Sequence, residues 1–220
     1  MIYDLTIYTL VTYILCITDN LINNLGYKNP YYLIHTIING VITYQIFPVI
    51  KTIYFDFQNS DNIETDINPM LLCLSLHIYH IIHYRKSIDF QDYIHHIPTI
   101  SILCYSLFIS DYNGPVIAHI LFYLCGLPGG IDYLLLFLVR NGIINRLTEK
   151  KVNTYLNLLI RYPGSVISSF ITIVYSQYNQ ISLFGCIITS LFTFVNGAYY
   201  TNRVMESYFY EKKNTKLNII

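Results

Sequence analysis

The sequence predicts an all-α integral membrane protein, a bundle of seven transmembrane helices, or of six if the first apolar run does not span. Hydrophobic residues make up 54% of the 220-residue chain and charged residues only 12%, against about 25% charged residues in soluble domains. The apolar residues come in runs close to the roughly 20 residues that cross a bilayer. Hydrophobicity continues around each predicted helix instead of forming one stripe, which argues against an amphipathic soluble bundle.

Four apolar runs occupy the N-terminal half of the chain, at residues 5–18, 31–55, 69–84 and 93–110. The first is short, and it spans a membrane only if its helix continues past Asp19 to about residue 25. The second is long enough to span, and Pro48 is able to kink its far end. An acidic loop follows the second run, and a short polar loop with Arg85 and Lys86 separates the third from the fourth.

Three further helices are predicted in the C-terminal half, at residues 115–139, 152–178 and 181–202. Pro115 suits the first turn of a helix, because its missing N–H would lack a partner there in any case. We expect interruptions at 126–130, which is rich in Gly and Pro, and at 161–164. Between Tyr162 and Asn202 there is no charged residue, which is the strongest membrane signal in the chain.

The basic residues predict the orientation of the bundle. With seven spans, only Lys51 lies near the opposite side and Arg161 lies inside a helix. The other Lys and Arg residues share one side: Lys28, Arg85, Lys86, Arg140, Arg146, Lys150, Lys151, Arg203, Lys212, Lys213 and Lys216. Basic loops stay in the cytosol, so we expect the loop after His83 and the C-terminus to be cytosolic. The expected location is the endoplasmic reticulum or another endomembrane.

Ionisable residues within the apolar runs are costly in lipid and therefore indicate function. Five of the seven histidines lie between positions 77 and 96. At about 1.5 Å of rise per residue, the ionisable groups fall in the cytosolic half of the membrane. We therefore expect a polar cavity open to the cytosol, with Asp132 paired to Arg161. The expected lining residues are His35, His77, His80, Asp132 and Arg161. Each could instead be a solvated or purely structural group.

A histidine near a carboxylate can act as a general base or as a nucleophile, so acyl transfer is chemically possible. His95, His96 and Asp92 are the catalytic candidates, with Asp89 close by. The histidine boxes of di-iron membrane enzymes are absent. A zinc site from His77, His80 and His96 is conceivable but lacks a recognised spacing. We therefore expect no metal and no cofactor, and acyl-CoA as co-substrate if the protein is an enzyme.

The segment 31–202 resembles the TLC-domain family, whose multi-pass domain occurs in ceramide synthases and in several non-enzymatic lipid-related proteins. The resemblance is carried by His35, the run DYIHHIPT at 92–99, Gly114, Leu127-Pro128-Gly129, Arg140-Asn141-Gly142, Asn157, Arg161 and Pro163. It implies a TLC-like transmembrane domain at 31–204, preceded by a short helix and linker at 1–30. A cytosolic tail would follow at 205–220.

The ceramide synthase pattern is matched only in part. His95-His96-Ile97-Pro98-Thr99 is similar to its His-His-x-x-Thr opening, and Ser106 to the serine that follows. The acidic His-Asp-x-Ser-Asp segment is missing, because His119 is followed by Ile120. We therefore expect a protein that binds lipids or takes part in membrane lipid homeostasis, and the alternative is N-acyl transfer from acyl-CoA by His95 and His96. The expected partners are membrane lipids. A net charge of zero gives nucleic acid no electrostatic support, and a homo-oligomer stays open.

Overall fold

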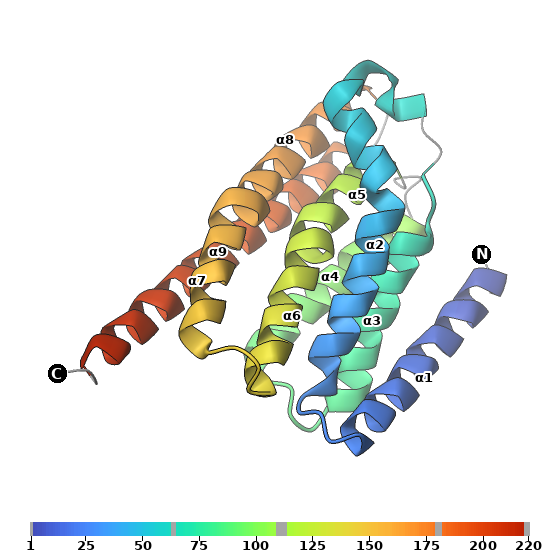
Figure 1. Cartoon of the computed structure of the whole chain (residues 1–220). Coiled ribbons are helices and arrows are strands. Elements are labelled where there is room, and N and C mark those ends of the chain that lie inside the picture. The colour runs from blue at the N-terminus through green and yellow to red at the C-terminus, as the bar shows by residue number, and fades with distance from the viewer. Residues whose placement is uncertain (1, 63–64, 109–113, 179–181, 218–220) are drawn as a thin grey trace.

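The computed structural model describes residues 2–62, 65–108, 114–178 and 182–217, and in these ranges it contains helices and turns but no strand (Figure 1). The described helices form seven rods. Four are single α-helices in the first half, and of the three rods that follow, two consist of two α-helices joined by a π-helical turn and the last is one α-helix. In order they are α1 (Ile2–Asn24), α2 (Pro30–Phe55), α3 (Asn68–Tyr84), α4 (Phe90–Phe108), α5 (Pro115–Leu121) continuing through η2 (Phe122–Gly126) into α6 (Leu127–Arg140), α7 (Arg146–Leu156) continuing through η3 (Asn157–Arg161) into α8 (Tyr162–Tyr178), and α9 (Leu183–Leu217). A short 3₁₀ helix, η1 (Phe57–Asn62), follows α2. The all-α prediction is confirmed.

The helices begin and end where the local chemistry favours it. Pro30 and Pro115 are the first residues of α2 and α5, a position that needs no backbone donor. The Asn145 side chain accepts a hydrogen bond from the Thr148 amide at 2.7 Å and so caps α7. Gly142, with a φ of 74°, follows α6 in the left-handed conformation that ends helices.

The expected interruptions near 126–130 and 161–164 are wrong, because both rods are continuous there. Each contains one π-helical turn, η2 or η3, in which the backbone widens by one residue per turn. Pro128 and Pro163 are the second residues of the α-helices that follow these turns. The π-helical turn therefore accommodates the proline, which has no backbone N–H to donate, without breaking the rod.

The last helix is longer than the sequence indicated. α9 continues through the expected boundary at 204/205 and ends at Leu217. Most residues from 203 onward are good helix formers, so nothing local stops the helix after the apolar run. Arg146 at the start of α7 lies 3.4 Å from Glu211 and ties this extension to the bundle. The described part of the predicted tail, up to Leu217, is therefore helical.

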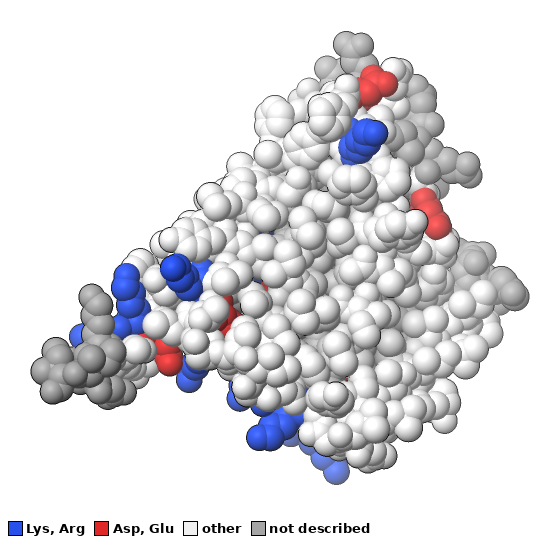
Figure 2. All heavy atoms as spheres, in the orientation of Figure 1, with Lys and Arg blue, Asp and Glu red and all other residues white. Residues whose placement is uncertain are grey.

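Large apolar side chains lie on the surface, and many polar side chains are buried beside the apolar core. Tyr44 and Phe184 are 83% and 73% exposed, whereas Asn157 and His119 are completely buried. Large exposed apolar surfaces of this kind require a partner or a membrane. Within the described ranges, four rods are long and apolar enough to cross a membrane, at Pro30–Phe55, Pro115–Arg140, Arg146–Gln177 and Leu183–Thr215. Figure 2 shows that the visible face of the molecule has a broad uncharged band, with charged groups mainly near the two ends of the molecule. These features fit an integral membrane protein.

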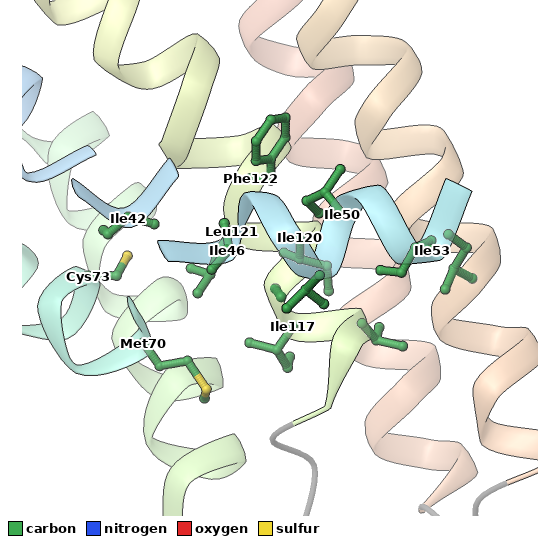
Figure 3. Packing of buried hydrophobic residues seen from close by; sticks show 14 of the residues in the cluster. Ile42, Ile46, Ile50, Ile53, Met70, Cys73, Ile117, Ile120, Leu121 and Phe122 are labelled. Atoms are coloured by element: carbon green, nitrogen blue, oxygen red, sulfur yellow. The ribbon is translucent and has the colours of Figure 1, made fainter. Parts of the chain in front are cut away.

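A layer of aliphatic side chains fills the bundle on the side of the α2 C-terminus (Figure 3). Most of its residues come from α2, α3 and α5, with single contributions from other helices such as Leu103 of α4, and it includes Ile42, Ile46, Ile50, Ile53, Met70, Cys73, Ile117, Ile120, Leu121 and Phe122. His35 lies about two turns before Ile42 on α2, and His77 and His80 lie about one and two turns after Cys73 on α3, in both cases toward the other end of the bundle. The bundle is therefore apolar at one end and polar at the other.

Candidate functional site

Five histidine rings from three helices meet in the polar half of the bundle. His35 comes from the second turn of α2, His77 and His80 from successive turns of α3, and His95 and His96 from the start of α4. The ring centroids of His80 and His96 are 4.7 Å apart, those of His77 and His96 are 5.0 Å apart, and those of His77 and His95 are 5.5 Å apart. Four of the rings are buried and His95 is half-buried. The histidine-rich stretch therefore folds back on itself across the α3–α4 turn.

These rings line a cavity of about 350 Å³. All eight residues predicted from the sequence line this one cavity: His35, His77, His80, Asp92, His95, His96, Asp132 and Arg161. Along α4 the lining changes from Asp92 and His95 at the start of the helix to Ile102 and Leu103 further on. α5 adds Ile117, Ile120 and Leu121 at the same apolar end. The cavity is therefore amphipathic along its length.

The expected pair of Asp132 and Arg161 is confirmed, with an Arg161 Nη2 to Asp132 Oδ2 distance of 3.7 Å. Asn153 Nδ2 donates to the other Asp132 oxygen at 2.6 Å, and Arg161 Nη1 donates to Asn157 Oδ1 at 3.1 Å. Asn157 Nδ2 donates to Asn153 Oδ1 at 2.7 Å, and the buried Glu149 accepts a longer bond from Asn153. Sequence reasoning missed Glu149 and Asn153, although the four-residue spacing from 149 to 161 places all four side chains on one helix face.

Several ring nitrogens at this site have no hydrogen-bond partner. Within the described part of the chain, the buried side-chain atoms without one are His77 Nε2, His80 Nδ1, His95 Nδ1, His96 Nδ1, Arg161 Nε, Asn39 Oδ1 and Thr201 Oγ1. All except Thr201 belong to residues that line the cavity. Leaving one buried polar atom unpaired costs about 1–3 kcal/mol. Such a concentration of unpaired atoms in one cavity favours occupation by a ligand, an ion or ordered water.

Asp92 reaches the cavity but is also used structurally. The Asp92 amide donates to Asp89 Oδ1 at 2.9 Å, and the Asp89 amide donates to Asp92 Oδ2 at 3.2 Å. This reciprocal arrangement caps the N-terminus of α4. Asp89 itself is exposed. Neither carboxylate is hydrogen-bonded to His95 or His96, so the structure contains the catalytic candidates in one cavity without a carboxylate–histidine pair.

His83 is separated from the other histidines of its stretch. Its Nε2 lies 3.2 Å from Asp19 Oδ1 on α1. Tyr84 donates a hydrogen bond of 2.7 Å to Asp19 Oδ2, and Tyr79 donates to the same oxygen. Asp19 is buried by these partners, which explains how α1 continues past a charged residue. This cluster joins α1 to α3 and is not part of the cavity.

His119 lies at the apolar end, as the sequence indicated. Its Nδ1 donates to Ser168 Oγ at 2.6 Å, because the Ser168 hydroxyl already donates to the Gly164 carbonyl. Its Nε2 then accepts from the Tyr54 hydroxyl at 3.2 Å. Both ring nitrogens are satisfied, in contrast to the histidines of the cavity. This histidine is therefore a structural one.

Comparisons of the chain with protein-family models, with curated proteins and with solved structures find no match. The functional argument therefore depends on the geometry of the cavity.

Proposed function

We propose that this protein is a TLC-like multi-pass membrane protein that binds an amphipathic lipid in the histidine-lined cavity and acts in membrane lipid homeostasis. The observation that carries the proposal is the change of the cavity lining from polar to apolar along its length. The polar group of the lipid would lie among the histidines and Arg161. The hydrocarbon chain would lie along Leu103 and Ile120.

The unpaired donor at Arg161 Nε favours a lipid whose polar group carries hydrogen-bond acceptors or negative charge. Arg203 of α9 lines the same end of the cavity and adds a second guanidinium group. Asp132 already engages one side of Arg161. A headgroup with an acceptor oxygen would therefore complete the guanidinium hydrogen bonding and not compete with Asp132.

The proposal includes a topology in which all seven rods cross the membrane and the polar end of the cavity faces the cytosol. The loops beside this end carry most of the basic residues, which favours the cytosolic side. A cysteine introduced at Ser87, an exposed residue in the loop between α3 and α4, should react with an impermeant thiol reagent only from the cytosolic side. Labelling of this position from the lumen or the cell exterior would contradict the topology.

Lipid binding can be tested by mass spectrometry of the full chain purified in a mild detergent. Leu124→Phe adds volume to a residue that lines the apolar end of the cavity, and it should reduce the amount of co-purified lipid. Leu191→Phe makes the same change at a side chain on α9 that is 61% exposed, and it should leave the bound lipid unchanged. Equal lipid retention by wild type and Leu124→Phe, or no specific lipid in the wild type, would contradict the proposal.

Acyl transfer is the second candidate, because His95 and His96 share the cavity with Asp132 and carry unpaired nitrogens. A histidine nitrogen would take the proton of a lipid amine as the amine nitrogen attacks the thioester carbonyl of acyl-CoA. The C–N bond would form, the C–S bond would break, and the thiolate of CoA would leave and take up the proton. Purified protein would then form an N-acyl lipid and lose this activity on His96→Ala but not on His83→Ala. Formation of this product would replace the non-enzymatic proposal.

A further inference from the structure

We infer that His77, His95 and His96 form a binding site for one divalent metal ion of the Zn²⁺ type. One potential ligand atom from each ring lies within 4.8 Å of the others. His77 and His96 are 5% and 2% exposed, and His95 is half-buried. Neutral imidazole is the commonest protein ligand for such ions, and three histidines are a known protein ligand set of catalytic zinc. The zinc set considered from the sequence was His77, His80 and His96, and the structure places His95 in the group instead of His80.

The spacing of the three rings needs only a small contraction to bind an ion. With zinc–nitrogen bonds of about 2.0–2.1 Å, tetrahedral geometry places ligand nitrogens about 3.3 Å apart. The three potential ligand atoms are up to 4.8 Å apart in this structure, which exceeds the ideal nitrogen–nitrogen distance by about 1.5 Å. Rotation of the imidazole rings about their soft terminal torsions can supply this change. His95 and His96 are on one helix and His77 is on its neighbour.

The hydrogen bonds around His77 favour metal binding. Its Nδ1 donates to the Cys73 carbonyl at 2.8 Å, since a carbonyl oxygen can only accept. The Nε2 atom therefore carries the free lone pair, and it is buried without a partner. A ligating histidine usually donates its other N–H to a carbonyl or carboxylate in this way. His95 and His96 each contribute a further buried nitrogen without a hydrogen-bond partner.

Simple packing of aromatic rings would not place these nitrogens together. The His77, His95 and His96 rings contact one another, but no hydrogen bond joins any two of them. By comparison, the buried His119 satisfies both of its nitrogens with Ser168 and Tyr54. The same chain thus contains one satisfied structural histidine and a group of unsatisfied ones. A metal ion accepts lone pairs from all three rings at once, and so it can satisfy these nitrogens together.

Three protein ligands leave a fourth position of the ion open, and all three rings line the cavity. A water molecule or a polar atom of a cavity ligand can occupy that position. His80 is the nearest further ring, 4.7 Å from the His96 ring between centroids, but it is outside the group of three. The inference is independent of the proposed lipid binding, and it excludes free His95 and His96 as acyl-transfer bases while the ion is bound.

The test uses the full chain in detergent micelles after removal of metal by a chelator. Titration with Co²⁺ should give saturable visible absorption typical of tetrahedral coordination at one ion per chain, and Zn²⁺ should displace it. His77→Gln and His96→Gln should weaken Co²⁺ binding by at least about 100-fold, more than the loss of an outer-shell partner. His83→Gln is the matched control on α3, because His83 pairs with Asp19 outside the cavity, and it should bind Co²⁺ as the wild type does.

A second measurement needs no variant and so does not depend on the variants' folding. Zn²⁺ should protect His77, His95 and His96 of the wild-type chain from histidine-acylating reagent, as mapped on peptides, and should leave His83 reactive. It should also raise the melting temperature with increasing Zn²⁺ concentration. Absence of saturable Co²⁺ binding, equal affinity in His96→Gln, or equal protection of His83 would overturn the inference. Because metal binding and co-purified lipid are measured separately, failure of this test leaves the lipid-binding result unaffected.

Discussion

The close contact between Gly164 and Tyr123 gives a sharp test of how the rods pack. A Cβ atom placed on Gly164 would lie 2.0 Å from Cδ1 and 2.2 Å from Cγ of the Tyr123 ring. Carbon atoms in contact are normally about 3.5–4.0 Å apart, so Gly164→Ala requires a displacement of roughly 1.5 Å. The ring is held in place, because the Tyr123 hydroxyl donates to Tyr54 at 3.1 Å and the ring packs on His119.

We expect Gly164→Ala to destabilise the protein by about 1–3 kcal/mol, the usual cost of overpacking a close contact. For a chain of this length that corresponds to a melting temperature lower by about 2–12 °C. Gly40→Ala is the matched control, because nothing lies within 4 Å of its Cβ position on an exposed face of α2. There alanine should stabilise the helix by up to about 1 kcal/mol and raise the melting temperature by about 2–4 °C.

Thermal unfolding in detergent can be followed with a thiol-reactive fluorophore, because the five free cysteines are buried or half-buried in the folded chain. Tyr123→Ala should cost less in the Gly164→Ala background than in the wild type, with a coupling free energy of about 0.5–3 kcal/mol. A Gly164→Ala protein that melts at or above the wild-type temperature would refute the reasoning. So would a Gly40→Ala protein that loses as much stability.

Three further outcomes follow from other contacts. Asp19→Ala should lower the free energy of unfolding by about 3 kcal/mol, because it leaves donors of α3 without their partner. Limited proteolysis should then release α1, and Asp19→Asn should have a smaller effect on both measurements. Asp132→Asn should lower the melting temperature more than the double variant Asp132→Asn/Arg161→Met does, because the single change leaves the buried charge of Arg161 unpaired. Equal melting temperatures of the two variants would argue against the ion pair of Asp132 and Arg161. Gly197→Ala places a Cβ 2.0 Å from Ser165 Oγ and should cost about 1–3 kcal/mol of unfolding free energy, whereas no change would mean that α8 and α9 can separate freely.

Much of the architecture could be predicted from local properties of the chain. The apolar runs predict the helices, because burial in lipid and internal backbone hydrogen bonding demand continuous helical segments. Helices begin at Pro30 and Pro115, because the first helical residue needs no backbone N–H donor, and α6 ends before Gly142, because glycine readily takes the left-handed conformation. The pair of Asp132 and Arg161 could be predicted because antiparallel neighbouring rods bring equal depths together, and because isolated charges in lipid are costly.

Apart from the pair of Asp132 and Arg161, the partners of the buried polar groups were decided by the tertiary structure alone. His83 and His80 are three positions apart on α3, yet His83 faces Asp19 of α1 and His80 faces the cavity. The π-helical turns, too, depend on the fit of whole rods, because local proline chemistry is equally compatible with a break. The ring of His77 meets His95 and His96 only because α3 and α4 pack side by side after their turn. Helical periodicity gives the face and depth of a side chain, but the rotation of neighbouring helices about their axes is set by packing across the whole bundle.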